Sequence, residues 1–317
     1  WYKNKSEDLL YSVPVPAQTG VSNTAVTMNA ASMENSGFEF SATYRNHDHA
    51  LKYDISANVS TLKNKVTSLG IGKDSYISGA YATYVGQEIG QFYGWVYKGI
   101  ARTQEDLDNN AVQQGANVGD CLYEDISGPD GTPDGVIDAY DQTVLGSGLP
   151  KVNFGLSTHM EYKGFDLNIS TYGVLNYHVS DDIYNSLNSC YGYGNKEVGM
   201  LDANRWSEDG TYLSSVPRTY AANNATLAWN DLFSSRKIQN AAYWKIANVE
   251  LGYNFPDKWF GGYVSGVRLY VSAQNLYTFT GYHGYNVDYA GGTFTPGYNF
   301  CSFPSARTFM CGLHFTF

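Results

Sequence analysis

An acidic, glycine-containing segment in the middle of the chain has the residue types and spacing of a calcium-binding loop. It runs from Asp130 to Asp141 and reads Asp-Gly-Thr-Pro-Asp-Gly-Val-Ile-Asp-Ala-Tyr-Asp. Oxygen-bearing side chains occupy its first, third, fifth, ninth and twelfth positions, a glycine at the sixth permits the sharp turn, and the seventh offers a backbone carbonyl. The spacing predicts a structural Ca²⁺ site formed by Asp130, Thr132, Asp134, Val136, Asp138 and Asp141.

This segment departs from the calcium-loop pattern at its last position, where Asp141 replaces the usual glutamate. A second register stays open, because Gly128 and Pro129 look like extra residues and Asp125 and Ser127 also carry suitable oxygens. The alternative to a metal site is an acidic turn in an exposed loop.

The sequence offers no combination of residues that is typical of an enzyme. It contains no G-x-S-x-G, no phosphate-binding loop and no H-E-x-x-H pattern. His47 and His49 lie two residues apart in a short turn, but two ligands do not complete a metal site. Glu124 and Asp125 are more simply explained by loop acidity than as paired glycosidase carboxylates. We therefore expect that the protein is not an enzyme.

Aromatic side chains are abundant between the expected structural elements. The chain has 28 Tyr and 6 Trp, and flat aromatic rings stack on sugars and also clamp peptide side chains. The candidates for contact with a bound substrate are Trp206, Tyr212, Tyr282 and Tyr285. The alternative is that these rings pack the loops against one another or against a partner.

The elements that position these residues are predicted to be β-strands. Residues Thr308–Phe317 alternate strictly, with Phe309, Leu313 and Phe315 among the apolar residues on one side. About ten residues is the length that a tilted strand needs to cross a bilayer. An alternating strand that ends on a C-terminal phenylalanine is typical of bacterial outer-membrane β-barrels.

Further segments show the same alternation and are predicted strands. They are Gly37–Asn46, Leu51–Thr61, Val152–Tyr162, Phe165–Leu175, Tyr243–Phe255 and Gly266–Phe279, and Trp1–Lys5 is predicted to end an earlier strand. Lys245 interrupts the apolar side of its segment near one end, where its ammonium group can snorkel to the interface.

The connections between these segments alternate in length. Residues 46–50, 163–164 and 256–265 are short, whereas 6–35, 63–150, 178–241 and 280–306 are expected to be long loops. Short turns at one end and long loops at the other are typical of outer-membrane barrels. The charged residues on the polar side, such as Glu39 and Asp166, suit a water-filled lumen better than a packed core.

The composition excludes some classes of protein but does not identify one. A net charge of −10 argues against binding to nucleic acid. No stretch approaches 18 consecutive apolar residues, so a membrane role has to rely on strands. The four cysteines include no C-x-x-C pair and neither require nor exclude disulfides.

Several blocks resemble the C-terminal part of SusC/RagA-type TonB-dependent transporters of the Gram-negative outer membrane. They begin with Asn-Ser-Gly-Phe-Glu-Phe at 35–40, Leu-Pro-Lys-Val-Asn-Phe-Gly at 149–155 and Tyr-Lys-Gly-Phe-Asp-Leu at 162–167. They continue with Asn-Arg-Trp at 204–206 and with the run from Tyr243 to Tyr253. The most specific are Arg-Leu-Tyr-Val-Ser-Ala-Gln-Asn-Leu at 268–276 and Pro-Ser-Ala-Arg-Thr-Phe at 304–309. The blocks occur in family order over nearly the whole chain.

This resemblance implies an antiparallel transmembrane β-barrel of about 22 strands with a plugged lumen. Residues 1–317 then form the C-terminal portion, about eight strands with long extracellular loops. The resemblance also implies a SusD-like surface lipoprotein as partner. It implies import of oligosaccharides or oligopeptides, driven by the TonB complex through parts of the receptor outside this sequence. The rival interpretation is a secreted β-rich glycan-binding module, which would bury the apolar side that a barrel turns to lipid.

Overall fold

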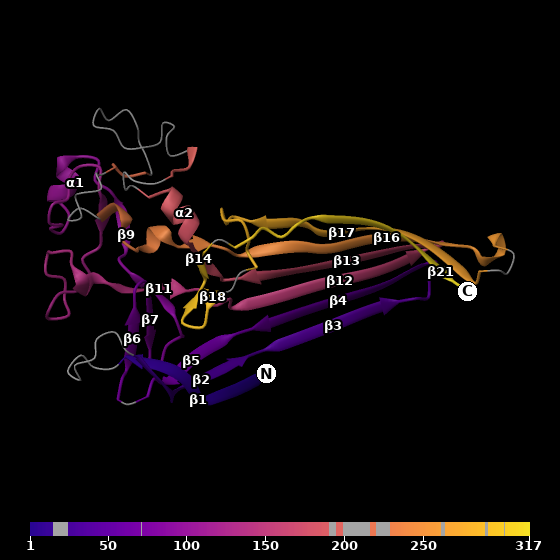
Figure 1. The fold of residues 1–317 in the computed structure, drawn as a ribbon, viewed down its shortest axis with the longest axis horizontal. Coiled ribbons are helices and arrows are strands. Elements are labelled where there is room, and N and C mark those ends of the chain that lie inside the picture. Colours follow the sequence, from indigo (N-terminus) through magenta and orange to yellow (C-terminus); the bar gives the residue numbers. More distant parts are fainter. Residues whose placement is uncertain are drawn as a thin grey trace.

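The computed structural model describes residues 1–14, 25–70, 72–189, 195–198, 216–219, 229–260, 264–288, 291–300 and 302–317. Its central element is a seven-stranded antiparallel sheet of long strands (Figure 1). In spatial order the strands are β21 (Thr308–Thr316), β17 (Gly266–Thr280), β16 (Tyr243–Phe255), β13 (Phe165–Leu175), β12 (Val152–Tyr162), β4 (Leu51–Thr61) and β3 (Glu39–Asn46). The sequence-based bounds of these strands are confirmed to within two residues.

The pairing register places side chains of one kind in rows across all seven strands. One row of directly paired residues consists of Thr43, Ser56, Ser157, Ser170, Asn248, Gln274 and Thr308. The adjacent row consists of Tyr44, Ile55, Thr158, Ile169, Val249, Ala273 and Phe309. Because consecutive side chains point to opposite sides of a sheet, these rows define a polar face and an apolar face.

Among the residues that the structure describes, no element covers the apolar face. Phe165, Leu251 and Leu313, which belong to three different strands of the sheet, are 52%, 45% and 58% exposed. A sheet of this size in water normally buries its apolar side, so such a face requires a nonpolar environment or a partner.

A second sheet continues the first at the N-terminal edge. Strand β1 (Tyr2–Pro14) pairs with β2 (Ala25–Gly37), and β2 pairs with β5 (Lys63–Ser68). Along the chain β2 leads directly into β3, and β4 leads directly into β5. The small sheet of β1, β2 and β5 therefore extends beyond the seven-stranded sheet (Figure 1). The prediction of a long loop over 6–35 is therefore wrong, since most of this stretch is a β-hairpin.

Two features explain why the alternation did not reveal this hairpin. Strand β1 contains a bulge after Ser6, where Asp8 adopts a positive φ of 55°, and the period of two is interrupted there. Strand β2 is rich in Ser, Asn and Ala, residues that strands do not favour.

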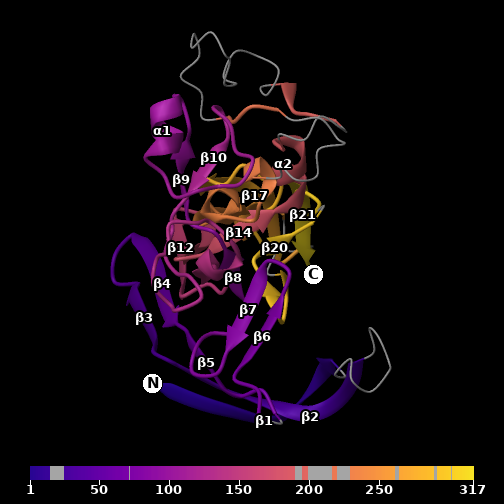
Figure 2. The ribbon, with the colours of Figure 1, turned by 90° about the vertical axis from the view of Figure 1, so that its left-hand side faces the viewer.

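The other long connections fold into a layer of short elements at one end of the sheet (Figures 1 and 2). Residues 63–150 form a sheet in the order β11 (Thr143–Ser147), β8 (Gln91–Gly94), β7 (Tyr81–Tyr84) and β6 (Ser75–Ser78). They also form the pair β9 (Tyr97–Ile100) and β10 (Cys121–Tyr123) and the helix α1 (Gln104–Asp108). The later loops supply β14 (His178–Asp181), α2 (Asp182–Leu187), β15 (Gln239–Asn240), β18 (Gly291–Gly292), β19 (Thr295–Pro296) and β20 (Tyr298–Asn299).

The clusters of buried apolar residues lie in this loop layer and where it meets the strands, rather than in the middle of the sheet. One cluster includes Val179, Ala241 and Tyr282, a second includes Val66 and Ile89, and a third contains Cys121, Tyr123 and Ile137. In the described part of the chain, no helix is long and apolar enough to span a membrane.

A bulge in β16 corrects the prediction for Lys245. Ser170 of β13 pairs with Asn248, but the next residue, Thr171, pairs with Ile246, so Ala247 is an extra residue. Beyond this point the alternation of β16 is inverted, and Lys245 pairs with Tyr172 of the polar face. An uninterrupted period of two predicts that Lys245 interrupts the apolar face. Because of the bulge, Lys245 lies on the polar face instead.

The bulge predicts which cysteine substitutions will be accessible from the polar side. Without the bulge Trp244 and Ile246 would lie on the polar face, and with it they lie on the apolar face. In a variant without native cysteines, Trp244→Cys and Ile246→Cys are therefore expected to react with a bulky charged maleimide as slowly as Leu167→Cys, at least about tenfold slower than Asn168→Cys, if lipid covers the apolar face. Rates measured on the protein in lipid bilayers test this, and reaction of both variants as fast as Asn168→Cys would contradict the bulge.

Candidate functional site

The polar face is the surface of this chain that is best equipped to contact a polar solute. Its middle row, from Thr43 to Thr308, contains hydroxyl and amide side chains and no charged group. Many charged residues, including Asp166, Glu250 and Arg268, lie on the side of this row toward the short turns, and a pocket whose lining is uncharged lies on the side toward the loop layer. Glu39 and the paired Lys245 and Asp288 lie toward the loop layer as well, so charge is not confined to one end of the face.

An ion-pair network links three strands near the short turns. The guanidinium group of Arg268 donates from Nε to Oδ2 of Asp166 at 3.0 Å and from Nη2 to Asp166 Oδ1. Arg268 Nη2 also donates to Glu250 Oε1 at 2.7 Å, and Asn254 Nδ2 donates to Asp166 Oδ2 at 3.0 Å. Asp166 is only 5% exposed, so these donors replace the water that its carboxylate would otherwise bind.

A glycine makes this network possible. Gly252 lies between Asp166 and Tyr270 in the paired row, and a Cβ atom there would come within 2.5 Å of Arg268 Nη2 and of Asp166 Oδ2. Without a side chain at this position, the arginine can cross β16 and reach the carboxylate on β13.

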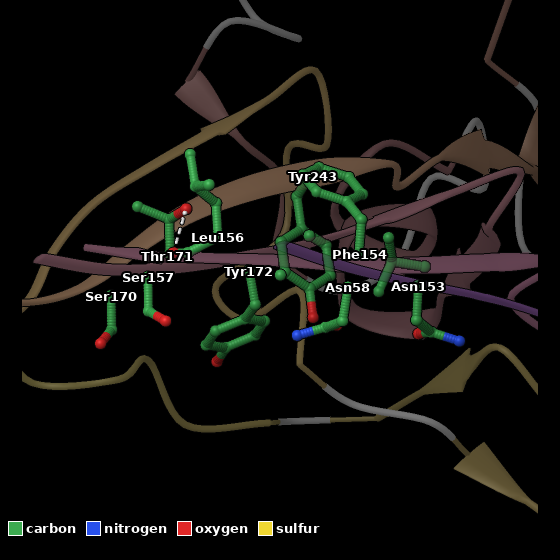
Figure 3. Close-up of a pocket in the computed structure, with 12 residues that line it drawn as sticks. Asn58, Asn153, Phe154, Leu156, Ser157, Ser170, Thr171, Tyr172 and Tyr243 are labelled. Atoms are coloured by element: carbon green, nitrogen blue, oxygen red, sulfur yellow. Dashed lines mark hydrogen bonds between the residues drawn. The ribbon is translucent and has the colours of Figure 1, made fainter. Parts of the chain in front are cut away.

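A pocket of about 460 Å³ lies on the polar face near the loop layer. Its lining includes Asn58 of β4, Ser157 of β12, Ser170 and Tyr172 of β13, and Tyr243 of β16. In Figure 3 Asn58, Ser157, Ser170 and Tyr172 point to one side of the sheet, and Leu156 and Thr171 point to the other. The lining carries no charged side chain, so it suits a neutral ligand with hydroxyl or amide groups.

The last loop is fastened to the sheet beside this pocket. Asp288 accepts a hydrogen bond from Lys245 Nζ at 2.5 Å and one from the hydroxyl of Tyr172 at 3.3 Å. Lys245 is 3% exposed and its ammonium group lies 5.8 Å from the centre of the Tyr172 ring. The ion pair therefore tethers the loop that contains residues 281–300 to the polar face.

The acidic segment around residue 141 is organised by its own hydrogen bonds. Asp141 is fully buried, and its carboxylate accepts backbone N–H groups of Ile126 at 2.8 Å, Ser127 at 3.2 Å and Asp138 at 2.8 Å. Asp138 Oδ1 accepts the N–H of Tyr140 at 2.7 Å. Asp141 thus has the surroundings of a loop anchor, with backbone donors on both of its oxygens.

The structure places the other predicted metal ligands on the surface of the same segment. Asp134 Oδ1 accepts the N–H of Val136 at 3.0 Å, and Asp130 and Thr132 are exposed. The N–H of Gly135 donates to Asp125 Oδ2 at 2.7 Å, while Asp125 Oδ1 is buried without a hydrogen-bond partner. In the part of the chain that the structure describes, three or more Asp, Glu, His or Cys side chains do not converge as metal ligands. Calcium binding by this segment stays a prediction.

The four aromatic candidates have different outcomes. Trp206 and Tyr212 lie outside the described residues. Tyr282 is 6% exposed, donates its hydroxyl to Asp181 and accepts a hydrogen bond from Asn299 Nδ2 at 2.6 Å, and burial raises the pKa of its phenol. Its ring belongs to the packed loop layer in this conformation. Tyr285 is 66% exposed and stays available for contact with a solute.

Sequence reasoning missed the polar groups that join distant loops. The carboxylate of Asp120 is 1% exposed. It accepts hydrogen bonds from Nε and Nη2 of Arg218, at 2.6 and 2.9 Å, and from Nδ2 of Asn230 at 2.8 Å. These residues are separated by about a hundred positions, and no local motif marks any of them. The Lys245–Asp288 pair was missed for the same reason.

Comparisons with known proteins give one consistent answer. No family model matches the chain. The TonB-dependent receptor P3 of Formosa agariphila is 31% identical over 336 residues, which cover 100% of this chain and 32% of that receptor. The TonB-dependent receptor SusC of Bacteroides thetaiotaomicron is 27% identical over 100% of this chain and 29% of its own length. These relatives are receptors, in agreement with the expectation that the chain is not an enzyme.

Comparison with solved structures shows the fold. The RagAB peptide importer in its closed-closed state superposes with a TM-score of 0.78 at 22% identity, covering 99% of this chain and 33% of that one. A second structure, of the RagAB peptide transporter, gives a TM-score of 0.78 at 21% identity. The all-β, antiparallel class predicted from the sequence is confirmed, and the chain spans about a third of the length of the proteins that it matches.

The tether between the last loop and the sheet can be tested by hydrogen exchange. Asp288→Asn removes the charge that Lys245 contacts, and a hydrogen bond between charged groups contributes about 1.5–3 kcal/mol. Amides of residues 281–288 and 291–300 are expected to exchange at least about tenfold faster, whereas β13 stays protected. Asp48→Asn, in a short turn at the opposite end, is the matched control. Unchanged exchange in Asp288→Asn would show that the loop is held without this ion pair.

Proposed function

We propose that this chain, which is homologous over its whole length to the SusC/RagA-type TonB-dependent receptors, forms part of a β-barrel that imports nutrients across the outer membrane of a Gram-negative bacterium. Residues 1–317 supply C-terminal strands of the barrel in this proposal. The plug and the segment that contacts TonB belong to other parts of the receptor.

The observation that carries the proposal is the two-faced sheet. Seven strands, most of them 9 to 15 residues long, form an apolar face that no described element covers and a polar face with ion pairs. Strands of about 9–11 residues cross a bilayer when tilted, and barrels alternate lipid-facing with lumen-facing residues. A secreted glycan-binding module would need to bury Phe165 and Leu251, which this fold leaves open.

The cargo in this proposal is an oligosaccharide or an oligopeptide, and a SusD-like surface lipoprotein is the partner that covers the long loops. Support for this comes from the relative named SusC and from the structures named as a peptide importer and transporter. The uncharged pocket beside Tyr172 and Tyr243 has hydroxyl, amide and aromatic groups that suit either cargo.

Uptake assays in cells test the proposal. The receptor that carries this chain is expressed with its lipoprotein partner in a host that lacks its own importers, and uptake of labelled oligosaccharides and oligopeptides is measured. Uptake of one class is expected, with loss of at least about 90% when TonB is deleted or the proton gradient is dissipated, because the energy comes from the inner membrane. Uptake that is independent of TonB, or recovery of the protein as a soluble secreted product, would contradict the proposal.

We also propose that the acidic loop binds Ca²⁺ through Asp134 and Asp138 of the predicted set, with Asp125 of the second register as a further ligand. Because these carboxylates do not converge in the structure, binding would draw them together. Each carboxylate has oxygen atoms or lone pairs that its backbone contacts leave free, and Ca²⁺ takes six to eight oxygens, so waters complete the shell. The metal would supply positive charge in this loop and no chemistry.

Calcium titration followed by hydrogen exchange tests this second proposal. Millimolar Ca²⁺ is expected to slow exchange of the amides in 125–141 by at least about fivefold, because binding stabilises the ordered loop. The pair Asp134→Asn and Asp138→Asn abolishes this response, while Asp108→Asn in α1 retains it. Identical exchange with Ca²⁺ and with chelator would mean that the hydrogen bonds to Asp141 alone hold the loop.

A further inference from the structure

Four lysines form a positively charged patch on the small sheet at the N-terminal edge. In the register of β1, β2 and β5, Lys3 and Lys63 both pair with Ser36, and Lys5 and Lys65 both pair with Glu34. All four lysines therefore share one side of this sheet, and all four are exposed. We refer to Lys3, Lys5, Lys63 and Lys65 as the lysine patch.

The patch carries an excess of positive charge in an acidic chain. Glu34 is the one acidic residue in the two paired rows, and Lys3 Nζ lies 2.7 Å from its Oε1. The hydrogen bond from Lys3 and the charges of Lys3, Lys5 and Lys65 lower the pKa of Glu34. Four ammonium groups and one carboxylate leave three positive charges here, on a chain whose net charge is −10.

The opposite side of this sheet faces the loop layer. Asn64 donates to Asn35 Oδ1 at 2.7 Å and accepts the N–H of Ile89 at 2.9 Å, and Val66 packs in the apolar cluster with Ile89. The lysine patch therefore points away from the protein.

The patch directly continues the apolar face of the large sheet. Glu39 pairs with Ser60 and Ser36 pairs with Lys63, so the ladder runs from β3/β4 into β2/β5 without a change of register. The N–H of Thr61 donates to the carbonyl of Phe38 at 2.8 Å and closes the join. Phe38, which is 65% exposed, and Val59 thus share a side with the lysines.

The distance along the strand places the lysines just beyond the apolar face. Lys63 follows Val59 by four residues, about 13 Å along an extended strand and less in height for a tilted one. Trp1, 73% exposed, and Phe38 lie between the apolar face and the lysines, where aromatic residues of membrane proteins meet the interface. The long loops lie at this end of the strands (Figure 1), so the patch faces the outer leaflet if the proposed membrane position holds.

We propose that the lysine patch binds the phosphate groups of lipid headgroups in the outer leaflet. Lysine ammonium groups act as point charges for phosphate, and rows on β1 and β5 lie about 10 Å apart across β2. That spacing suits a headgroup with more than one phosphate. The inference rests on the proposed barrel, because only a membrane-inserted sheet brings this edge to the headgroups.

Native mass spectrometry of the intact receptor in neutral detergent tests the inference. The double variant Lys63→Gln/Lys65→Gln is compared with the unmodified receptor, with bisphosphorylated lipid A as the probe. Affinity is expected to fall on the order of tenfold to thirtyfold, because each interfacial lysine contributes about fivefold. The control variant Lys73→Gln/Lys258→Gln removes two exposed lysines elsewhere and is expected to bind normally.

Further probes separate this inference from its alternatives. Dephosphorylated lipid A with the same acyl chains is expected to bind weakly, and its equal binding would overturn phosphate recognition. Displacement of the lipid by millimolar inorganic phosphate would indicate a free-phosphate site instead. Normal lipid binding by Lys63→Gln/Lys65→Gln, with loss of the lipoprotein partner, would reassign the patch to a protein contact. A receptor that fails to insert into membranes at all would contradict the proposed function rather than this inference.

Discussion

The structure depends on one constraint, the pairing of backbone amides in the long strands with neighbouring strands. In hydrocarbon an unpaired N–H or C=O group costs several kcal/mol, so strands survive there only in an unbroken ladder. β12 satisfies this condition on both sides, with eleven consecutive pairs to β4 and to β13. Directly paired residues lie on the same side of a sheet. In a continuous ladder, the sides to which the residues of one strand point therefore fix the sides for all the other strands. This is why a row from Thr43 to Thr308 is polar throughout.

The ladder departs from regular pairing where the sheet meets the loop layer. Ala247 is an extra residue in β16, and Asn275 of β17 adopts a positive φ of 51° beside it. The inverted alternation moves Lys245 from the apolar face to the polar face. There it holds Asp288, so a local irregularity of one strand fastens the last loop.

Strands were predictable from the sequence where apolar and polar residues alternate to form the two faces of the sheet. Phe165–Leu175 shows this alternation and was placed correctly. β2 lacks such alternation, and its polar sequence gave no signal. Contacts such as Asp120 with Arg218 depend on loops about a hundred residues apart, which no local spacing records. The calcium-type spacing predicts a Ca²⁺ site, which stays a prediction, and the backbone donors around Asp141 could not be read from residue types.

The measurement that tests the two-faced sheet most directly is fluorescence quenching by brominated lipids in reconstituted membranes. Single tryptophans are placed at Leu167, Leu251 and Leu313 on the apolar face, and at Asn168 and Ser272 on the polar face, in a background without other tryptophans. Brominated acyl chains are expected to quench the first three strongly and the last two very little, because only the first three contact lipid. Equal quenching at both sets of positions would show that the sheet does not separate lipid from a lumen.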